Sequence, residues 1–176
     1  MGKPDSAGDG VEDGREVSTR KRVEEAIQLN AAWAPVFERD ERVGALLREM
    51  GEAIAASARI MADLGVSRIC MQCDKEDGGS CCGAGIESSY STVLLLINFL
   101  LGNRPPTRRQ FPDGCFFLGE HGCTLTARDV LCVNYLCSRI QRALTREELG
   151  KLQNTTGREM DVLFALNETL KKKIAA

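Results

Sequence analysis

The chain has few aromatic residues and little excess charge of either sign. Aromatic residues make up 5% of its 176 residues, with a single tryptophan, so platforms for stacking nucleic-acid bases are not expected. The 23 basic and 25 acidic residues leave a formal net charge of -2, which gives no broad field toward nucleic acid or an anionic membrane. One histidine offers little material for a histidine-based mechanism. The sequence therefore predicts no nucleic-acid partner.

Long apolar runs are also missing. The most apolar stretch, VLLLINFLL at residues 93–101, is much shorter than the about 20 residues that a transmembrane helix needs. The opening residues, MGKPDSAGDGVEDGRE, contain no apolar core of a secretory signal. There is also no GxSxG element, P-loop or dinucleotide fingerprint. These features predict a cytoplasmic protein without membrane contact, for which no enzymatic reaction is assigned.

Apolar periodicity predicts a mainly α-helical fold. Residues 1–18 are rich in Gly, Asp and Glu and are interpreted as a disordered tail, and residues 19–176 as a single helical domain. Hydrophobic residues, at 43%, are sufficient for a core. The expected architecture is a helical bundle with a cysteine-rich loop and hairpin module that binds metal. Helices are predicted over residues 19–34, 36–64, 88–101, 127–143 and 146–172.

Local signals predict where these elements begin and end. Pro35 should end the first helix or begin the next one, and Gly65 is a natural C-cap after residues 36–64. Residues 66–70 could form a short strand or an extended segment. The stretch 115–125 resembles a hairpin with a turn at residues 119–122. Thr145 with Glu148 three residues later is a capping box.

All of the cysteines lie between residues 70 and 137, in two segments. In a reducing compartment such a set favours metal or redox chemistry over disulfides. A C-x2-C pair can aim two thiolates at one ion, and zinc accepts four thiolates in a tetrahedron. All eight thiols are therefore candidate metal ligands: Cys70, Cys73, Cys81 and Cys82 in the first segment, and Cys115, Cys123, Cys132 and Cys137 in the second.

Several arrangements of the eight thiols remain open at this point. They could form two four-ligand zinc sites, one site plus structural cysteines, or an iron–sulfur cluster. The adjacent Cys81 and Cys82 can reach one ion only in a turn, and otherwise they serve different sites. On one helix Cys132 and Cys137 would diverge by about 140°, so they can share a site only if the helix ends between them. The single histidine, His121, could be a zinc ligand or an exposed turn residue.

The sequence CMQCDKEDGGSCC at residues 70–82, followed by CFFLGEHGCTLTARDVLCVNYLC at residues 115–137, resembles the zinc- or iron-chelating cysteine-cluster family. That family is known by a CxxCxxCC signature followed by a second cysteine-bearing segment. The resemblance covers about residues 66–140. This chain has seven residues between Cys73 and Cys81 where the family pattern has two. The resemblance implies metal chelation by these cysteines and supplies no reaction.

Three functions follow from these observations. The first is a metal-binding protein that chelates zinc or iron through both cysteine segments, which would tie the central helix of residues 88–101 into place. The second is an iron–sulfur or thiol redox protein that carries electrons. The third is a module in which the metal is structural and the apolar face of residues 36–64 binds a protein partner.

Overall fold

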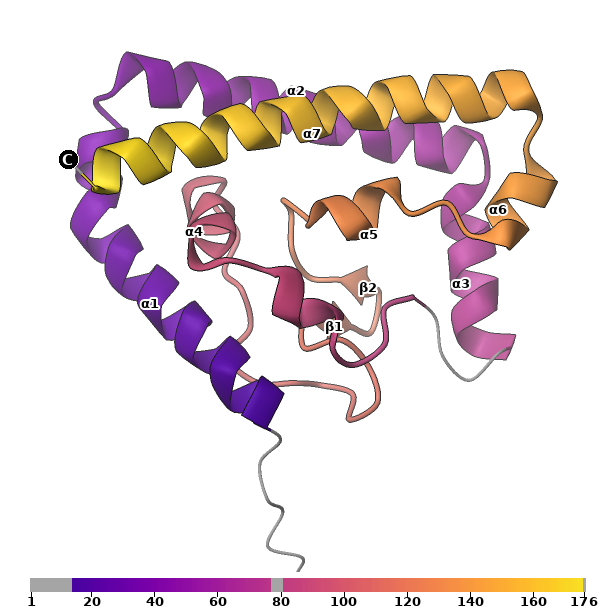
Figure 1. Cartoon of the computed structure of the whole chain (residues 1–176), viewed down its shortest axis with the longest axis horizontal. Coiled ribbons are helices and arrows are strands. Elements are labelled where there is room, and N and C mark those ends of the chain that lie inside the picture. The colour runs from indigo at the N-terminus through magenta and orange to yellow at the C-terminus, as the bar shows by residue number, and fades with distance from the viewer. Residues whose placement is uncertain (1–13, 77–80, 176) are drawn as a thin grey trace, which may run out of the picture.

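The computed structural model describes residues 14–76 and 81–175, and most of these residues are helical (Figure 1). The first helices are α1 (Gly14–Phe37), α2 (Glu41–Asp63) and α3 (Val66–Glu76). A 3-10 helix, η1 (Ile86–Ser89), precedes α4 (Thr92–Leu100), and β1 (Leu118–Gly119) pairs antiparallel with β2 (Gly122–Cys123). These are followed by α5 (Val130–Asn134), α6 (Ser138–Ala143) and α7 (Arg146–Ile174).

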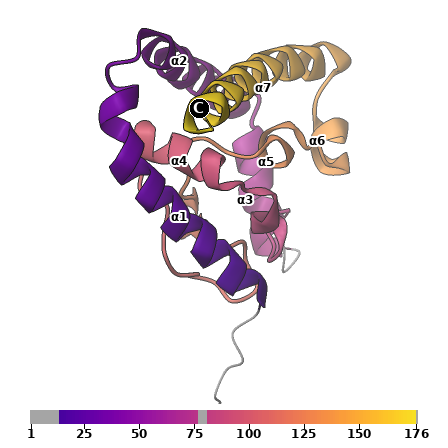
Figure 2. The ribbon, with the colours of Figure 1, turned by 60° about the vertical axis from the view of Figure 1, so that its left-hand side comes forward.

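The long helices α2 and α7 lie side by side and run in opposite directions (Figures 1 and 2). The predicted capping box begins α7: the amide of Glu148 donates to the Thr145 hydroxyl at 3.3 Å, and the amide of Thr145 donates to the Glu148 carboxylate at 2.8 Å. Apolar side chains at helical spacing are buried on both helices. They are Val43, Leu46 and Met50 on α2 and Leu152, Val162, Leu163, Leu166 and Leu170 on α7.

The short helix α4 lies at the centre of the fold, as its almost entirely apolar sequence predicts. Ser91 caps α4 by accepting a hydrogen bond from the amide of Leu94 at 3.2 Å. Asn98 is fully buried on α4, and its amide group donates to the carbonyl of Ala127 at 2.9 Å and accepts from the amide of Thr126 at 2.8 Å. Because α1 packs on α4, the central helix is enclosed between α1, α7 and the loop that follows the hairpin.

The first half of the chain corrects three predicted boundaries. Pro35 lies inside α1, which continues to Phe37 because that residue is buried and stacks on Trp33 at 5.6 Å. The predicted helix over residues 36–64 is interrupted at residues 38–40, where the Asp40 side chain accepts from the amide of Val43 at 3.0 Å and caps α2. The predicted tail over residues 1–18 lies outside the described residues up to residue 13, and residues 14–18 are helical.

Two further segments differ from the sequence-based expectation. Residues 66–70 are helical and belong to α3, because Val66 packs into a second apolar cluster with Ile140 and Leu152. The predicted helix over residues 127–143 is divided into α5 and α6, with an extended backbone at residues 135 and 137. The break allows Ile140 to reach that second cluster. The predicted hairpin is confirmed with shorter strands, and Gly65 (φ +71) follows the end of α2 as predicted.

No helix in the described part of the chain is both long enough and apolar enough to cross a bilayer.

Candidate metal centre

The two cysteine-bearing segments meet through their backbones. The amide of Cys115 donates to the carbonyl of Cys82 at an N···O distance of 2.7 Å, and Gly83 forms an antiparallel bridge with Gly114. A Cβ atom at Gly114 would lie 3.0 Å from a methyl carbon of Leu118, so a glycine suits this close approach. The pairing brings Cys82 and Cys115 together although α4 lies between them in the sequence.

The β1–β2 hairpin brings Cys115 and Cys123 into the same region. Cys115 is buried, and its sulfur accepts a hydrogen bond from the amide of Phe117 at 3.5 Å. Gly119 permits the tight turn, because a Cβ atom there would lie 2.8 Å from a methyl carbon of Thr124. As a result, Cys123 lies close enough to Cys115 for its charge to raise the pKa of the Cys115 thiol.

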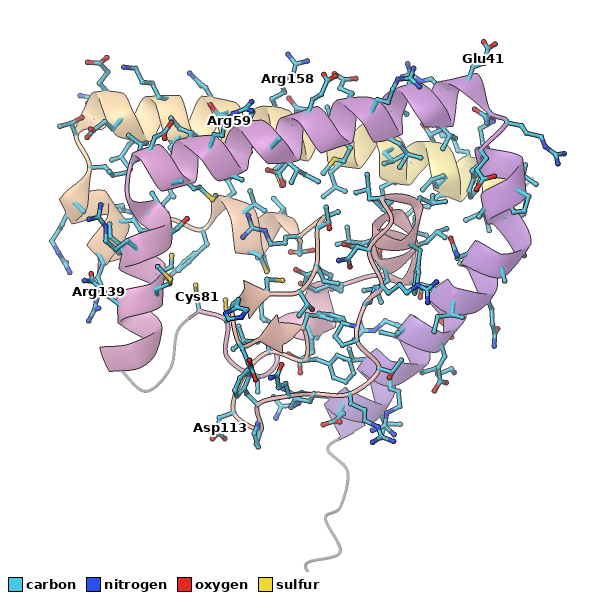
Figure 3. All side chains as sticks on the ribbon, turned by 180° about the vertical axis from the view of Figure 1, so that it is seen from behind. Glu41, Arg59, Cys81, Asp113, Arg139 and Arg158 are labelled. Atoms are coloured by element: carbon cyan, nitrogen blue, oxygen red, sulfur yellow. The ribbon has the colours of Figure 1, made fainter. Side chains whose placement is uncertain are left out.

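Cysteines from α3, from the segment after it and from the start of α6 form what we call the first thiol group: Cys70, Cys73, Cys81 and Cys137. Cys70 and Cys73 are three residues apart on α3, which places them on neighbouring positions of one face. Cys137 is the N-cap residue of α6, and α6 contacts α3. Figure 3 shows Cys81 between α3 and the hairpin.

The pKa values of the first thiol group reflect this crowding. Burial raises the pKa of Cys70, and the neighbouring thiols of Cys137, Cys82 and Cys73 raise it further. A hydrogen bond with the Cys82 thiol, followed by burial, raises the pKa of Cys81 far above its ordinary value. Charged thiolates would repel one another here, so Cys70 and Cys81 are protonated at neutral pH in the absence of a cation.

A second thiol group gathers at the hairpin and α5: Cys115, Cys123 and Cys132. Burial raises the pKa of Cys115 to about 12, and Glu87, Cys123 and Cys132 add to the shift. Burial also raises the pKa values of Cys123 and Cys132. The Tyr90 hydroxyl donates a hydrogen bond to the Cys132 sulfur at 3.5 Å, so a phenol lies in direct contact with this group.

Cys82 connects the two thiol groups. Its charge raises the pKa values of Cys70 and Cys81 in the first group and of Cys123 and Cys132 in the second. Cys81 and Cys82 lie in a turn, which is the conformation in which adjacent cysteines can share surroundings. The predicted helix does end between Cys132 and Cys137, but the two cysteines nevertheless belong to different groups.

One positive charge acts on both thiol groups. Arg128, in the loop before α5, lowers the pKa of Cys70 in the first group and of Cys123 in the second, which offsets part of the effect of burial. Its guanidinium also lies 4.0 Å from the sulfur of Met61 on α2. Arg128 is therefore a source of charge compensation for any thiolate that forms here.

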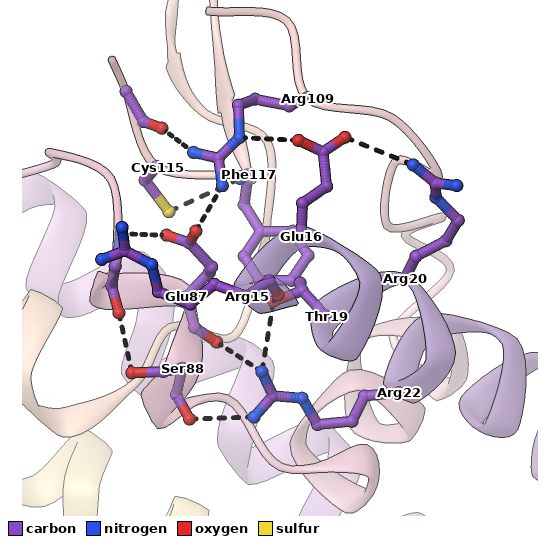
Figure 4. Close-up of polar contacts among 12 residues, drawn as sticks. Arg15, Glu16, Thr19, Arg20, Arg22, Glu87, Ser88, Arg109, Cys115 and Phe117 are labelled. Carbon is purple, nitrogen blue, oxygen red and sulfur yellow. Dashed lines mark hydrogen bonds and ion pairs between the residues drawn. The ribbon is translucent and has the colours of Figure 1, made fainter. Parts of the chain in front are cut away.

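An ion-pair network fastens α1 to the paired segments (Figure 4). Arg109 donates to the carboxylate of Glu87 at 2.5 Å, to that of Glu16 on α1 at 3.3 Å, and to the carbonyl of Gly114. Arg22 on α1 donates to the carbonyl of Ser88 at 2.9 Å. With these acceptors around it, the Arg109 side chain is only 8% exposed.

None of the eight cysteines, all of which lie in the described ranges, takes part in a disulfide. Within the described ranges, no three or more His, Cys, Asp or Glu side chains surround a common point in the way that a metal ion requires. His121, the other candidate ligand, is exposed in the turn between β1 and β2. The thiols are therefore gathered by the fold but are not oriented toward one position.

Sequence reasoning missed the polar residues that support the thiols. The Tyr90 hydroxyl contacts the sulfur of Cys132, which lies 42 positions further along the chain. Glu87 and Arg109 are likewise separated by 22 positions. A single sequence carries no signal for such long-range contacts.

Comparisons with protein-family models, with curated proteins and with solved structures found no match for this chain.

Proposed function

We propose that this protein binds a transition-metal ion, zinc or iron, through cysteine thiolates supplied by residues 70–82 and 115–137. The observation that carries the proposal is the backbone pairing of Cys82 with Cys115, around which the two thiol groups gather. The resemblance of residues 66–140 to the zinc- or iron-chelating cysteine-cluster family supports the same conclusion.

The chemistry of the donors favours this class of ligand. A set of sulfur donors with few neighbouring imidazoles or carboxylates suits zinc, iron or an iron–sulfur cluster better than magnesium or calcium. Burial is the main cause of the raised pKa values of Cys70 and Cys115, and neighbouring thiols add to the shifts because thiolates would repel one another. A divalent cation removes that repulsion, so metal binding would release protons and would become tighter as the pH rises.

Metal binding would require the sulfurs to turn. A cysteine side chain has three staggered χ1 positions, and rotation about χ1 moves the sulfur without moving the backbone. The backbone pairing of Cys82 with Cys115 already holds the two segments together, so side-chain rotation can direct sulfurs from both segments at one ion. The bound metal would then clamp both segments and stabilise α4 between them, because the free energy of binding contributes to that of folding.

The test is elemental analysis of the untagged, anaerobically purified protein, with a Cys-to-Ser series over all eight positions. We expect at least one equivalent of zinc or iron per chain, with large losses in Cys82→Ser and Cys115→Ser. Met71→Ser is the matched control, because it removes an exposed sulfur between Cys70 and Cys73 that is not a thiol. That variant should keep its metal.

Three outcomes would contradict parts of the proposal. Protein without metal from cells supplied with zinc and iron would refute it. Metal content that is unchanged in all eight serine variants would show that the thiols are not the ligands. Brown protein that contains iron and acid-labile sulfide would replace a single metal ion with an iron–sulfur cluster on the same thiols.

A further inference from the structure

A cavity of about 490 Å³ lies between α1 and the loop that precedes the β1–β2 hairpin. One wall is formed by α1, whose charged side chains recur there at four-residue spacing and so lie on one face of the helix. The other wall is formed by residues 107–109. The lining residues are Glu16, Arg20 and Glu24 on α1, and Thr107, Arg108 and Arg109 in the loop. None of them belongs to a thiol group, so metal binding does not account for this cavity.

The inner charges of the cavity already neutralise one another (Figure 4). The carboxylate of Glu16 accepts from Arg109 at 3.3 Å and from Arg20 at 3.4 Å. Arg109 is also the ion-pair partner of the buried carboxylate of Glu87. Two carboxylates therefore balance two guanidinium groups, and this part of the cavity has no formal charge left for a further anion to neutralise.

The outer charges of the cavity are different, because they have no partners. Glu24, Thr107 and Arg108 are exposed, and none of them forms a hydrogen bond or an ion pair within residues 14–76 and 81–175. Glu24 lies on the α1 wall, and Arg108 lies on the loop wall. A carboxylate and a guanidinium on opposite walls attract a ligand that carries both charges, whereas a ligand with charge of one sign is repelled by one of them.

We propose that this cavity binds a small zwitterion, a free amino acid or a short peptide, whose carboxylate pairs with Arg108 and whose ammonium group pairs with Glu24. The cavity volume lies within the range of about 300 to 1,000 Å³ that is typical of small-molecule sites. The planar guanidinium of an arginine can hold a carboxylate through two parallel hydrogen bonds. The hydroxyl of Thr107, beside Arg108, can donate to or accept from polar atoms of the ligand.

The affinity should be modest, because water screens both charge pairs at the exposed mouth of the cavity. We expect a Kd on the order of 1 mM for a ligand held mainly by exposed ion pairs. The inference is independent of the proposed metal binding, since the cavity and the thiol groups share no side chain.

The test is a titration of ¹⁵N-labelled, reduced full-length protein, followed by the NMR shifts of its amides. The probes are L-glutamine and two analogues with one charge each: N-acetyl-L-glutamine lacks the ammonium group, and L-glutaminamide lacks the carboxylate. L-Alanyl-L-glutamine is titrated in parallel, and the tighter of the two zwitterions identifies the ligand as a free amino acid or a short peptide. We expect saturable shifts at residues 16–24 and 107–109, and binding of both single-charge analogues that is weaker by about threefold or more.

Variants test the two charges separately. Glu24→Gln and Arg108→Gln should each weaken binding by about threefold or more, because each removes one charge. Glu49→Gln and Arg158→Gln are the matched controls, since they neutralise an exposed ion pair between α2 and α7 at 3.3 Å and should leave the affinity unchanged. Glu24→Arg combined with Arg108→Glu exchanges the two charges between the walls, and it should bind L-glutamine more tightly than either reversal alone.

Several results would overturn the inference. Equal binding of L-glutamine and N-acetyl-L-glutamine would show a site for anions alone, and equal binding of L-glutaminamide would show a site for cations alone. The absence of a saturable shift with either zwitterion at tens of millimolar would also overturn it, as would wild-type affinity in both Glu24→Gln and Arg108→Gln. None of these results changes the expected metal content, so the two proposals fail separately.

Discussion

Replacing Arg109 by methionine should destabilise the fold strongly and in a pH-dependent way. The carboxylate of Glu87 is fully buried, and Arg109 is its ion-pair partner at 2.5 Å. After the replacement, the amide of Gly85 at 2.8 Å remains as a hydrogen-bond donor to that carboxylate. Removing one partner of a buried ion pair typically costs about 3 to 5 kcal/mol, and we expect Arg109→Met to fall in this range.

The pH dependence follows from the pKa of Glu87. Burial raises this pKa, but hydrogen bonds from its own backbone, from Arg109 and from Gly85 outweigh burial and hold the pKa below its ordinary value. In the wild type this group therefore adds stability at neutral pH that is lost as the pH falls through the folded pKa. Without Arg109, burial dominates and the pKa rises above its ordinary value, so protonation of Glu87 relieves the variant at mildly acidic pH.

The assay is urea unfolding followed by far-UV circular dichroism at pH 7 and pH 5, with reductant present. The difference in unfolding free energy between wild type and Arg109→Met should be largest at pH 7 and smaller at pH 5. Arg158→Met is the control, because the Arg158–Glu49 pair is exposed and should contribute less than about 1 kcal/mol. A double variant with Glu87→Gln should recover part of the lost stability. A loss below about 1 kcal/mol, or one that is equal at both pH values, would refute this reasoning.

Two other buried polar residues give opposite predictions. Asn98→Ala removes the hydrogen-bond partner of buried backbone groups at Ala127 and Thr126. We expect it to lower the free energy of unfolding, measured in urea, by about 3 kcal/mol or more. A loss under about 1 kcal/mol would show that water replaces the amide. Among the described residues, neither carboxyl oxygen of Glu159 has a hydrogen-bond partner. Burial raises the pKa of Glu159, and the nearby Ser57 and Arg128 offset only part of that rise. A raised folded pKa lowers stability as the pH rises above the ordinary value, so Glu159→Met should be more stable than wild type by about 1 to 3 kcal/mol at pH 7, with the gain shrinking toward pH 4. A variant that is less stable than wild type at pH 7 would indicate that the Glu159 carboxylate is needed.

Local signals predicted most helices but not all of their ends. The capping box at Thr145, the apolar run of α4 and the turn at residues 119–122 are each written within a few adjacent residues, and each is found in the structure. The errors arise where tertiary packing decides. Pro35 is tolerated inside α1 because Phe37 is buried beyond it, and Val66 begins a helix because its side chain packs with Ile140 and Leu152.

The candidate site was predicted only at the level of residue type. The eight cysteines could be named from their spacing, but their division into two groups joined by Cys82 depends on the backbone pairing across α4 and on the break after α5. The Tyr90 and Arg128 contacts depend on the same long-range arrangement. Spacing therefore identifies possible ligands, whereas the fold determines which of them become neighbours.

The pairing of α2 with α7 has a consequence for biosynthesis. α2 ends at Asp63 and α7 begins at Arg146, so a ribosome that adds about 5 to 20 residues per second needs on the order of ten seconds to make the second helix after the first. During that interval the apolar face of α2, which includes Val43, Leu46 and Met50, lacks its packing partner α7. It is therefore accessible to chaperones or to other nascent chains. The N-terminal part of the chain therefore cannot complete the hydrophobic core by itself. The tertiary structure can form in full only after α7 has been synthesised.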